Sequence, residues 1–168
     1  NGVIGSVLEA IEVSGDGNYL RNAGEITSAG ETGVRFTGAN SIVQNSGLIS
    51  GALLRTSTST GSKSGLSLGE GANVQNSGTI SGNFVGVFGT EDLRIINSGL
   101  IDGGNLFGGR GVIASDGAYI SNTGLITGSF YGVLSSAITR SVTVINIGTI
   151  ESETTAIQIG GSTDGNLV

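Results

Sequence analysis

Acidic side chains are the residues of this sequence with the clearest capacity for chemistry. They recur at equivalent places, in glycine-rich turns after short apolar runs, as Asp16, Glu70, Glu91, Asp92, Asp116 and Asp164. Carboxylates in such turns can bind calcium through their oxygens. The tandem Gly-Gly-x-Gly-x-Asp units of calcium-binding repeats are absent, however, and only the fragment Gly15-Asp16-Gly17-Asn18 is present. We therefore expect no cofactor and interpret the acids as solvated turn residues, with calcium binding as the alternative.

Cleavage of a polysaccharide is the second chemistry to consider. It needs clustered carboxylates with a basic residue, or two carboxylates that flank the bond. Asp102 follows Ile101 and lies near Arg110 in the sequence, but no second acid is clearly on the same strand face. Histidine and cysteine are absent, which excludes histidine-dependent triads and thiol chemistry. We predict that the chain is not an enzyme, and the alternative is a polysaccharide lyase, hydrolase or epimerase.

A repeat supplies the elements that would position these residues. The unit Asn-x-Gly-x-Ile occurs six times, and a truncated copy opens the chain as Gly2-Val3-Ile4. Successive asparagines are separated by 23, 31, 21, 25 and 24 residues, so the basic period is near 23 with insertions. Each repeat also holds a small residue with apolar alternation, as in Gly33-Val34-Arg35-Phe36, and an apolar pair before its asparagine, as in Ile42-Val43. Three short β-rich runs per repeat are therefore predicted.

Runs this short bury their apolar side chains only if the repeats stack. The sequence predicts an all-β, right-handed parallel β-helix, a three-sided β-solenoid of about seven rungs, whose handedness follows from the preference for right-handed crossovers. One column of isoleucines is expected, formed by Ile4, Ile26, Ile49, Ile80, Ile101, Ile126 and Ile150. One column of amides is expected, formed by Asn22, Asn45, Asn76, Asn97, Asn122 and Asn146. Asparagine tolerates the left-handed backbone of a tight corner, and the glycine two residues later would permit the close turn.

Composition agrees with an ordered array and narrows its partners. The chain has 32 glycines, no proline or cysteine, and 37% hydrophobic residues. The absence of proline suits strands that hydrogen-bond on both edges. A net charge of -6 argues against nucleic acid, and no apolar run approaches the roughly 20 residues of a membrane span. We expect residues 1–168 to form a single solenoid segment with both ends cut from a longer array, because each end falls inside a repeat unit.

Insertions into the repeat mark the surfaces where binding is easiest to accommodate. Two fall at equivalent places, 52–63 and 104–109, and a third near 135–141 falls on another edge. The first two would project from the same edge and form a small mixed contact patch of Leu53, Leu54, Arg55, Lys63, Leu106, Phe107 and Arg110. Tolerated loops without a ligand are the alternative, since surface loops vary freely.

Three tracts carry a resemblance to a known class of proteins. Asn-Ser-Gly-Leu-Ile-Ser-Gly (45–51), Asn-Ser-Gly-Thr-Ile-Ser-Gly (76–82) and Asn-Thr-Gly-Leu-Ile-Thr-Gly (122–128) resemble the degenerate repeats of bacterial autotransporter passenger domains and related large surface adhesins. The resemblance covers essentially the whole chain. It implies a β-helix that Gram-negative bacteria secrete or display at the outer membrane, for adhesion, aggregation or as a stalk. The implied partners are a host or bacterial surface glycan or protein, or a second copy of the solenoid. A glycan-binding or polysaccharide-active domain is the alternative.

Overall fold

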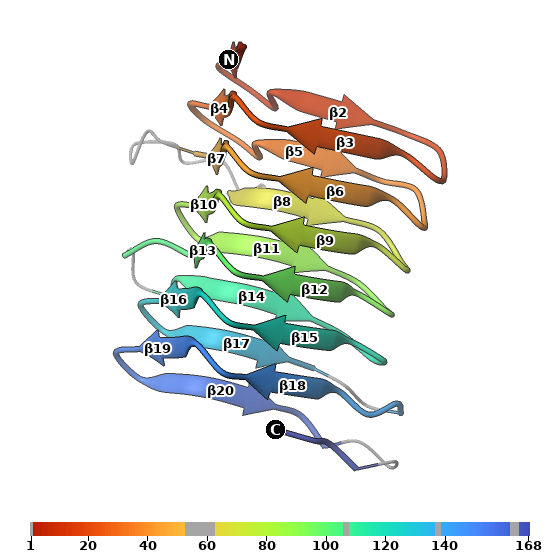
Figure 1. Cartoon of the computed structure of the whole chain (residues 1–168), viewed down its shortest axis with the longest axis vertical. Helices are drawn as coiled ribbons and strands as arrows, with labels where there is room; N and C mark the ends of the chain where they lie inside the picture. The colour runs from red at the N-terminus through yellow and green to blue at the C-terminus, as the bar shows by residue number, and fades with distance from the viewer. Residues whose placement is uncertain (1, 53–62, 106–107, 137–138, 162–164) are drawn as a thin grey trace.

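The computed structural model describes residues 2–52, 63–105, 108–136, 139–161 and 165–168. Over these ranges the chain forms twenty strands, β1 to β20, and coils right-handedly from its N-terminus at one end to its C-terminus at the other (Figure 1). The predicted all-β parallel β-helix is confirmed, with about six turns and a period of about 24 residues. In the described part of the chain, no helix long and apolar enough to cross a membrane is present.

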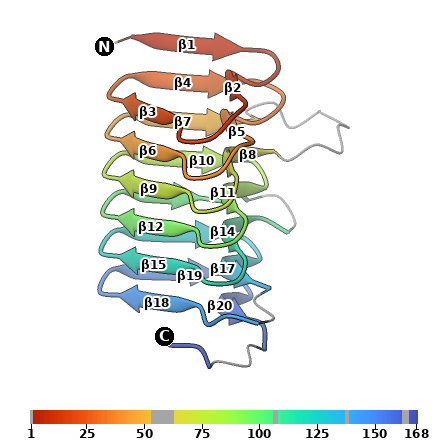
Figure 2. The same cartoon turned by 90° about the vertical axis from the view of Figure 1, so that its right-hand side faces the viewer.

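Three parallel sheets make the three sides, and each turn contributes one strand to each sheet (Figure 2). Sheet A contains β1 (Val3–Ser6), β4 (Glu25–Ser28), β7 (Leu48–Gly51), β10 (Thr79–Gly82), β13 (Leu100–Asp102), β16 (Leu125–Gly128) and β19 (Thr149–Ser152). Sheet B contains β2 (Ile11–Val13), β5 (Val34–Phe36), β8 (Ser64–Leu68), β11 (Val85–Gly89), β14 (Arg110–Ala114), β17 (Tyr131–Ser135) and β20 (Thr155–Ile159). Sheet C contains β3 (Tyr19–Asn22), β6 (Ile42–Asn45), β9 (Asn73–Asn76), β12 (Arg94–Asn97), β15 (Tyr119–Asn122) and β18 (Thr143–Asn146).

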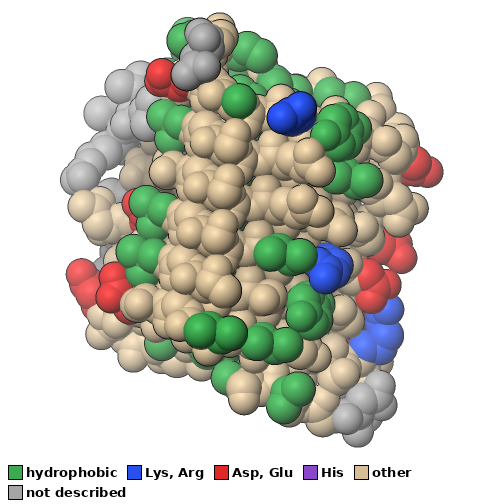
Figure 3. Space-filling view, in the orientation of Figure 1, with side chains coloured by type: hydrophobic (Ala, Val, Ile, Leu, Met, Phe, Trp, Pro, Cys, Tyr) green, Lys and Arg blue, Asp and Glu red, His purple; other side chains and the backbone are tan. Residues whose placement is uncertain are grey.

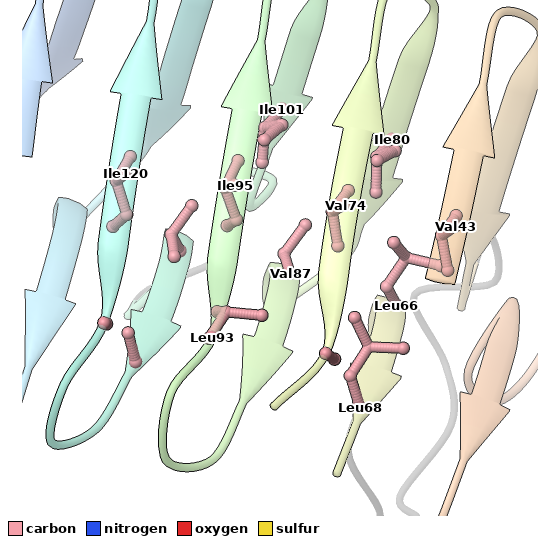
Figure 4. Close-up of a cluster of buried hydrophobic side chains, with 14 of the residues drawn as sticks. Val43, Leu66, Leu68, Val74, Ile80, Val87, Leu93, Ile95, Ile101 and Ile120 are labelled. Carbon is pink, nitrogen blue, oxygen red and sulfur yellow. The ribbon is translucent and has the colours of Figure 1, made fainter. Parts of the chain in front are cut away.

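The interior consists of aliphatic columns that run along the axis. The predicted isoleucine column is confirmed, because each of its seven members pairs in register with the next along sheet A. Sheets B and C add valine, leucine and isoleucine columns, and side chains from all three sheets meet in one core (Figure 4). Burial of this apolar surface is the main stabilising term, and it grows with each added turn.

The small residue that opens each sheet B run has a packing reason. A Cβ atom on Gly86 would lie 2.7 Å from Cγ2 of Ile101, and one on Gly111 would lie 2.7 Å from Cγ2 of Ile126. Both distances are well inside van der Waals contact. A Cβ atom at either position would also meet a backbone carbonyl of the next turn, at 2.6 Å for Gly86 and 2.5 Å for Gly111. These glycines therefore make room both for the isoleucine column and for the neighbouring backbone.

We expect Ile101→Val to lower the free energy of unfolding by about 1 kcal/mol, because it removes one methylene group from a close-packed interior. The side chain of Ile101 is fully buried, whereas Ile4 in the same column is 47% exposed. Ile4→Val is thus the matched control and should cost less. Urea unfolding monitored by circular dichroism measures both. Equal losses at the two positions would contradict the column as the source of stability.

The asparagines form a continuous ladder at the corner between sheets C and A, as predicted. Each Nδ2 donates to Oδ1 of the next asparagine at 2.8 to 2.9 Å, from Asn22 through to Asn146. The same Nδ2 also donates to the carbonyl oxygen of the glycine two residues on and to a carbonyl of the next turn, as Asn76 does to Gly78 and Leu100. The amides are therefore partnered both within a turn and between turns.

One detail of the predicted corner is wrong, because the ladder asparagines do not adopt a left-handed backbone. Neither the ladder asparagines nor the glycines that follow them have positive φ. The glycine is required for space: a Cβ atom on Gly99 would lie 2.1 Å from the carbonyl oxygen of Gly78. A stacked column of residues with left-handed backbone lies instead at the corner between sheets B and C, formed by Gly17, Asn40, Gly71, Asp92 and Gly117.

Candidate functional site

The outer face of sheet C carries a regular set of polar, aromatic and aliphatic side chains. One column, in register across the six strands, is Tyr19, Ile42, Asn73, Arg94, Tyr119 and Thr143. The second is Arg21, Gln44, Gln75, Ile96, Ser121 and Ile145. A third follows the corner just after each asparagine, as Ala23, Ser46, Ser77, Ser98, Thr123 and Ile147. We call these three columns together the sheet C face.

A shallow, open groove of about 530 Å³ runs along this face. It is lined by Arg21, Gln44, Asn45, Ser46, Gln75, Asn76, Ser77, Ile96 and Ser98. The long glutamine and arginine side chains stand beside the short serines of the corner, and the ladder asparagines between them turn inward to the amide column. The alternation of long, inward and short residues produces the groove. Two successive turns line it with the same set of glutamine, asparagine and serine, and the turns on either side add Arg21, and Ile96 with Ser98.

The charges of the sheet C face differ from those of the whole molecule. The chain has 13 acidic and 7 basic residues, yet none of the side chains of this face is acidic and two are arginines. Figure 3 shows basic side chains on this face and acidic ones towards its margins. Arg94 lies over the ring of Tyr119, 4.9 Å from its centroid. Within the described ranges Arg21 forms no ion pair.

The acidic turns predicted to share one ridge do lie together, at the corner between sheets B and C. Backbone hydrogen bonds stack the turns of Asp16, Glu70, Glu91 and Asp116, and Asp164 lies outside the described residues. Oδ1 of Asp16 accepts a hydrogen bond from the backbone N–H of Ala39 at 2.8 Å. Among the described residues, no group of three or more acids converges as a metal site would require. Calcium binding by these acids stays the untested alternative.

One basic residue, Arg140, connects its own turn to the acids of a turn two positions earlier along this ridge. Arg140 donates from Nη1 to both carboxylate oxygens of Asp92, at 2.6 and 2.7 Å, and from Nη2 to Glu91 at 3.0 Å. The hydrogen bond to Asp92 raises the pKa of Arg140, so the guanidinium stays charged throughout the usual pH range. Asp116, in the turn between, accepts hydrogen bonds from Thr139. The cluster therefore ties the segment near 139–140 to the two preceding turns.

We expect Arg140→Gln to lower the melting temperature at low ionic strength, because Asp92 and Glu91 would lose their cationic partner. Both acids are largely exposed, so salt screens the interaction and the difference from the wild type should shrink in 1 M NaCl. Arg21→Gln is the control, since Arg21 has no acidic partner in the described ranges. A difference that persists unchanged at high salt would show that the cluster does not act through charge.

The two larger insertions lie where predicted with respect to their flanking strands. Both connect sheet A to sheet B, between β7 and β8 and between β13 and β14, with one turn between them. The third connects sheets B and C, between β17 and β18. Of the predicted patch, Lys63 and Arg110 are described, whereas Leu53, Leu54, Arg55, Leu106 and Phe107 lie outside the described residues. The patch therefore stays a prediction.

Arg110 and Asp102, considered above for catalysis, are engaged in separate contacts. Arg110 donates from Nη1 to the carbonyl of Gly108 and lies over the ring of Phe84, 4.9 Å from its centroid. Oδ1 of Asp102 accepts a hydrogen bond from the backbone N–H of Gly104 at 2.8 Å. The structure does not bring the two charged groups together as an ion pair.

Sequence reasoning missed the sheet C face, although the signal for it is simple. Its two strand columns are the residues one and three positions before each ladder asparagine. Because successive strand residues point to opposite sides, the inward asparagine and the apolar residue two before it place these positions outside. Comparison across repeats then shows two arginines, two tyrosines, two glutamines and no acid in these columns.

In comparisons with known proteins, no family model, no curated protein and no solved structure matches the chain. The solenoid and its surfaces are therefore the source of evidence on function. The sheet C face offers hydrogen-bonding groups repeated along a line. The ridge between sheets B and C offers carboxylates with partners in the chain.

Proposed function

We propose that the chain is a non-catalytic structural and adhesive segment of a secreted or cell-surface bacterial β-helix protein. The observation that carries the proposal is the stacking of the same two internal columns, isoleucine and asparagine, through every turn. Such columns serve to extend and stiffen a rod. A rod that repeats its surface at each turn presents the same side chains many times, which suits adhesion or a stalk.

The hydrogen bonds of the buried polar side chains support this function over an enzymatic one. The buried asparagines donate to one another and to backbone carbonyls, so their hydrogen-bonding capacity serves the stack. Asp102 and Arg110, the acid and base that a polysaccharide-cleaving site would use, each hold a nearby backbone group. Partners of such a rod would be a surface glycan, a surface protein or a second copy of the chain.

The test combines an activity assay with an adhesion assay. The purified chain is incubated with polygalacturonate, alginate and neutral dextran, and the release of new reducing ends is followed. We expect no release above the buffer blank. Depolymerisation that is lost in the Asp102→Asn variant would overturn the proposal in favour of an enzyme. In parallel, beads coated with the chain should be retained on surfaces that carry at least one of these polymers or the chain itself, whereas albumin-coated beads should not.

A further inference from the structure

Charge separates the sheet C face from the rest of the surface. The described acids lie on sheets A and B and at the corners, including Glu25 and Asp102 on sheet A and Glu12 on sheet B. Arg35 and Arg140 are paired with acids, at 3.1 Å from Glu9 and 2.6 Å from Asp92. Arg21 and Arg94, in contrast, form no ion pair in the described ranges. An acidic molecule thus presents one face on which unpaired positive charge is available.

The neutral groups of this face are arranged in a line. Gln44 and Gln75 are adjacent in one column, and Ser46, Ser77 and Ser98 follow one another along the corner. Neighbouring turns lie about 4.8 Å apart, so amide and hydroxyl groups repeat at that spacing along the groove. The serine hydroxyls donate to backbone carbonyls of the preceding turn, as Ser77 does to Asn45, and keep the capacity to accept, whereas the glutamine amides carry both donors and an acceptor. A ligand that contacts several turns at once must therefore be extended and lie parallel to the axis. It must also be rich in groups that donate and accept hydrogen bonds.

The two arginines define where negative charge would be placed. Arg21 lines the groove, and three turns of register separate its strand from β12, which carries Arg94. Three turns correspond to about 14 Å along the axis. Arginine pairs with a carboxylate through two parallel hydrogen bonds, which makes these contacts both strong and directional. On the same face, Tyr19 donates from its hydroxyl to Oε1 of Gln44, and the ring of Tyr119 lies under Arg94.

We propose that the sheet C face binds an acidic linear polysaccharide, a polymer of sugars that bears carboxylates, laid along the solenoid axis in the groove. The hydroxyls of the sugars hydrogen-bond to the glutamines and serines, and carboxylates pair with Arg21 and Arg94. This inference rests on the proposed adhesive function and names its surface and ligand class.

Other occupants fit these observations less well. Nucleic acid affinity depends on many phosphate contacts, and the face supplies two cations on a chain of net charge -6. A peptide that adds a strand needs an open sheet edge, whereas the backbone of sheet C is already paired between turns. A second copy of the chain would have to present its acidic ridge to this face.

The experiment measures binding of the intact chain to immobilised polygalacturonate and alginate, with neutral dextran and single-stranded DNA as comparison polymers. The key variant is the double substitution Arg21→Gln with Arg94→Gln. Arg35→Gln is the control for loss of positive charge elsewhere, because it removes one charge from sheet B. Arg21 and Arg94 are exposed, and an unchanged melting temperature verifies that the double variant is folded.

We expect the wild type to bind at least one of the two carboxylated polymers, in a salt-sensitive manner and at least about tenfold more tightly than dextran. The double variant should bind about tenfold or more weakly, and Arg35→Gln should bind as the wild type does. Binding to neither carboxylated polymer, equal binding to DNA, or an equal loss in Arg35→Gln would overturn the inference. Self-association in sedimentation that the double variant loses, without glycan binding, would assign the face to a second copy and also overturn it.

These outcomes are separable from those that test the proposed function. Failure to bind glycans, with no depolymerisation, removes the inference and leaves a structural or stalk role intact. Binding accompanied by depolymerisation removes the non-catalytic function and leaves the binding face intact.

Discussion

Gly99→Ala is expected to destabilise the fold by about 3 kcal/mol, which corresponds to a fall in melting temperature of about 10 °C for a chain of this size. The added methyl group would lie 2.1 Å from the carbonyl oxygen of Gly78 and 2.7 Å from the carbonyl carbon of Ser77. Both atoms belong to the backbone of the preceding turn, so no side-chain rotation can relieve the overlap. The two turns must separate at this corner, which lengthens the hydrogen bonds on either side.

The chain provides a matched control in Gly5. A Cβ atom there would meet Oγ1 of Thr27 at 3.6 Å, an ordinary contact, and Gly5 lies in β1 without a left-handed backbone. Gly5→Ala should therefore leave the melting temperature within about 2 °C of the wild type. Thermal unfolding followed by circular dichroism measures both variants. If the two substitutions had the same effect, close stacking would not be the reason for the glycine column.

Asn97→Ala is expected to cost about 3 kcal/mol, because several buried partners lose a hydrogen bond at once. Nδ2 of Asn97 donates to the carbonyls of Gly99 and Leu125 and to Oδ1 of Asn122, and its Oδ1 accepts from Asn76. Asn122 is fully buried, and its Oδ1 would lose the hydrogen bond that the preceding asparagine of the ladder donates. Urea unfolding gives the change in free energy.

Asn146→Ala removes a ladder asparagine at an exposed position, where water can replace the lost hydrogen bonds. Asn146 is exposed, and it accepts from Nδ2 of Asn122 at 2.8 Å. Its removal should cost about 1 kcal/mol or less, since solvent can replace the lost partner. A loss as large as that of Asn97→Ala would show that burial of the ladder is not what makes its hydrogen bonds valuable.

The fold was predictable from sequence because its signals are repeated. Val43 and Val74 each indicate only a short strand, but recurrence one turn later fixes which residues must stack. The register of the isoleucine and asparagine columns follows directly, and every predicted pair in them is present. The predicted basic period near 23, lengthened by insertions in some turns, agrees with the observed period of about 24 residues.

The physical reason why certain residues recur at fixed positions in every repeat was harder to predict. A glycine after an asparagine suggests a left-handed turn in almost any sequence, yet Gly99 is needed because another backbone lies against it. That contact joins residues one turn apart, so no local pattern contains it. The groove was missed for a similar reason: Gln44, Gln75 and Ser77 are unremarkable singly and form a surface only when stacked.

The amide column has an electrical consequence. Along the column from Asn22 to Asn146, Nδ2 of each asparagine donates a hydrogen bond to Oδ1 of the asparagine in the following turn. All of these hydrogen bonds therefore point in the same direction along the axis. The side-chain dipoles are thus aligned head to tail, with their oxygens toward the N-terminal turns. Aligned hydrogen bonds polarise one another inside a low-dielectric core. The rod therefore has a polar axis, and a turn inserted upside down would oppose the field of all its neighbours.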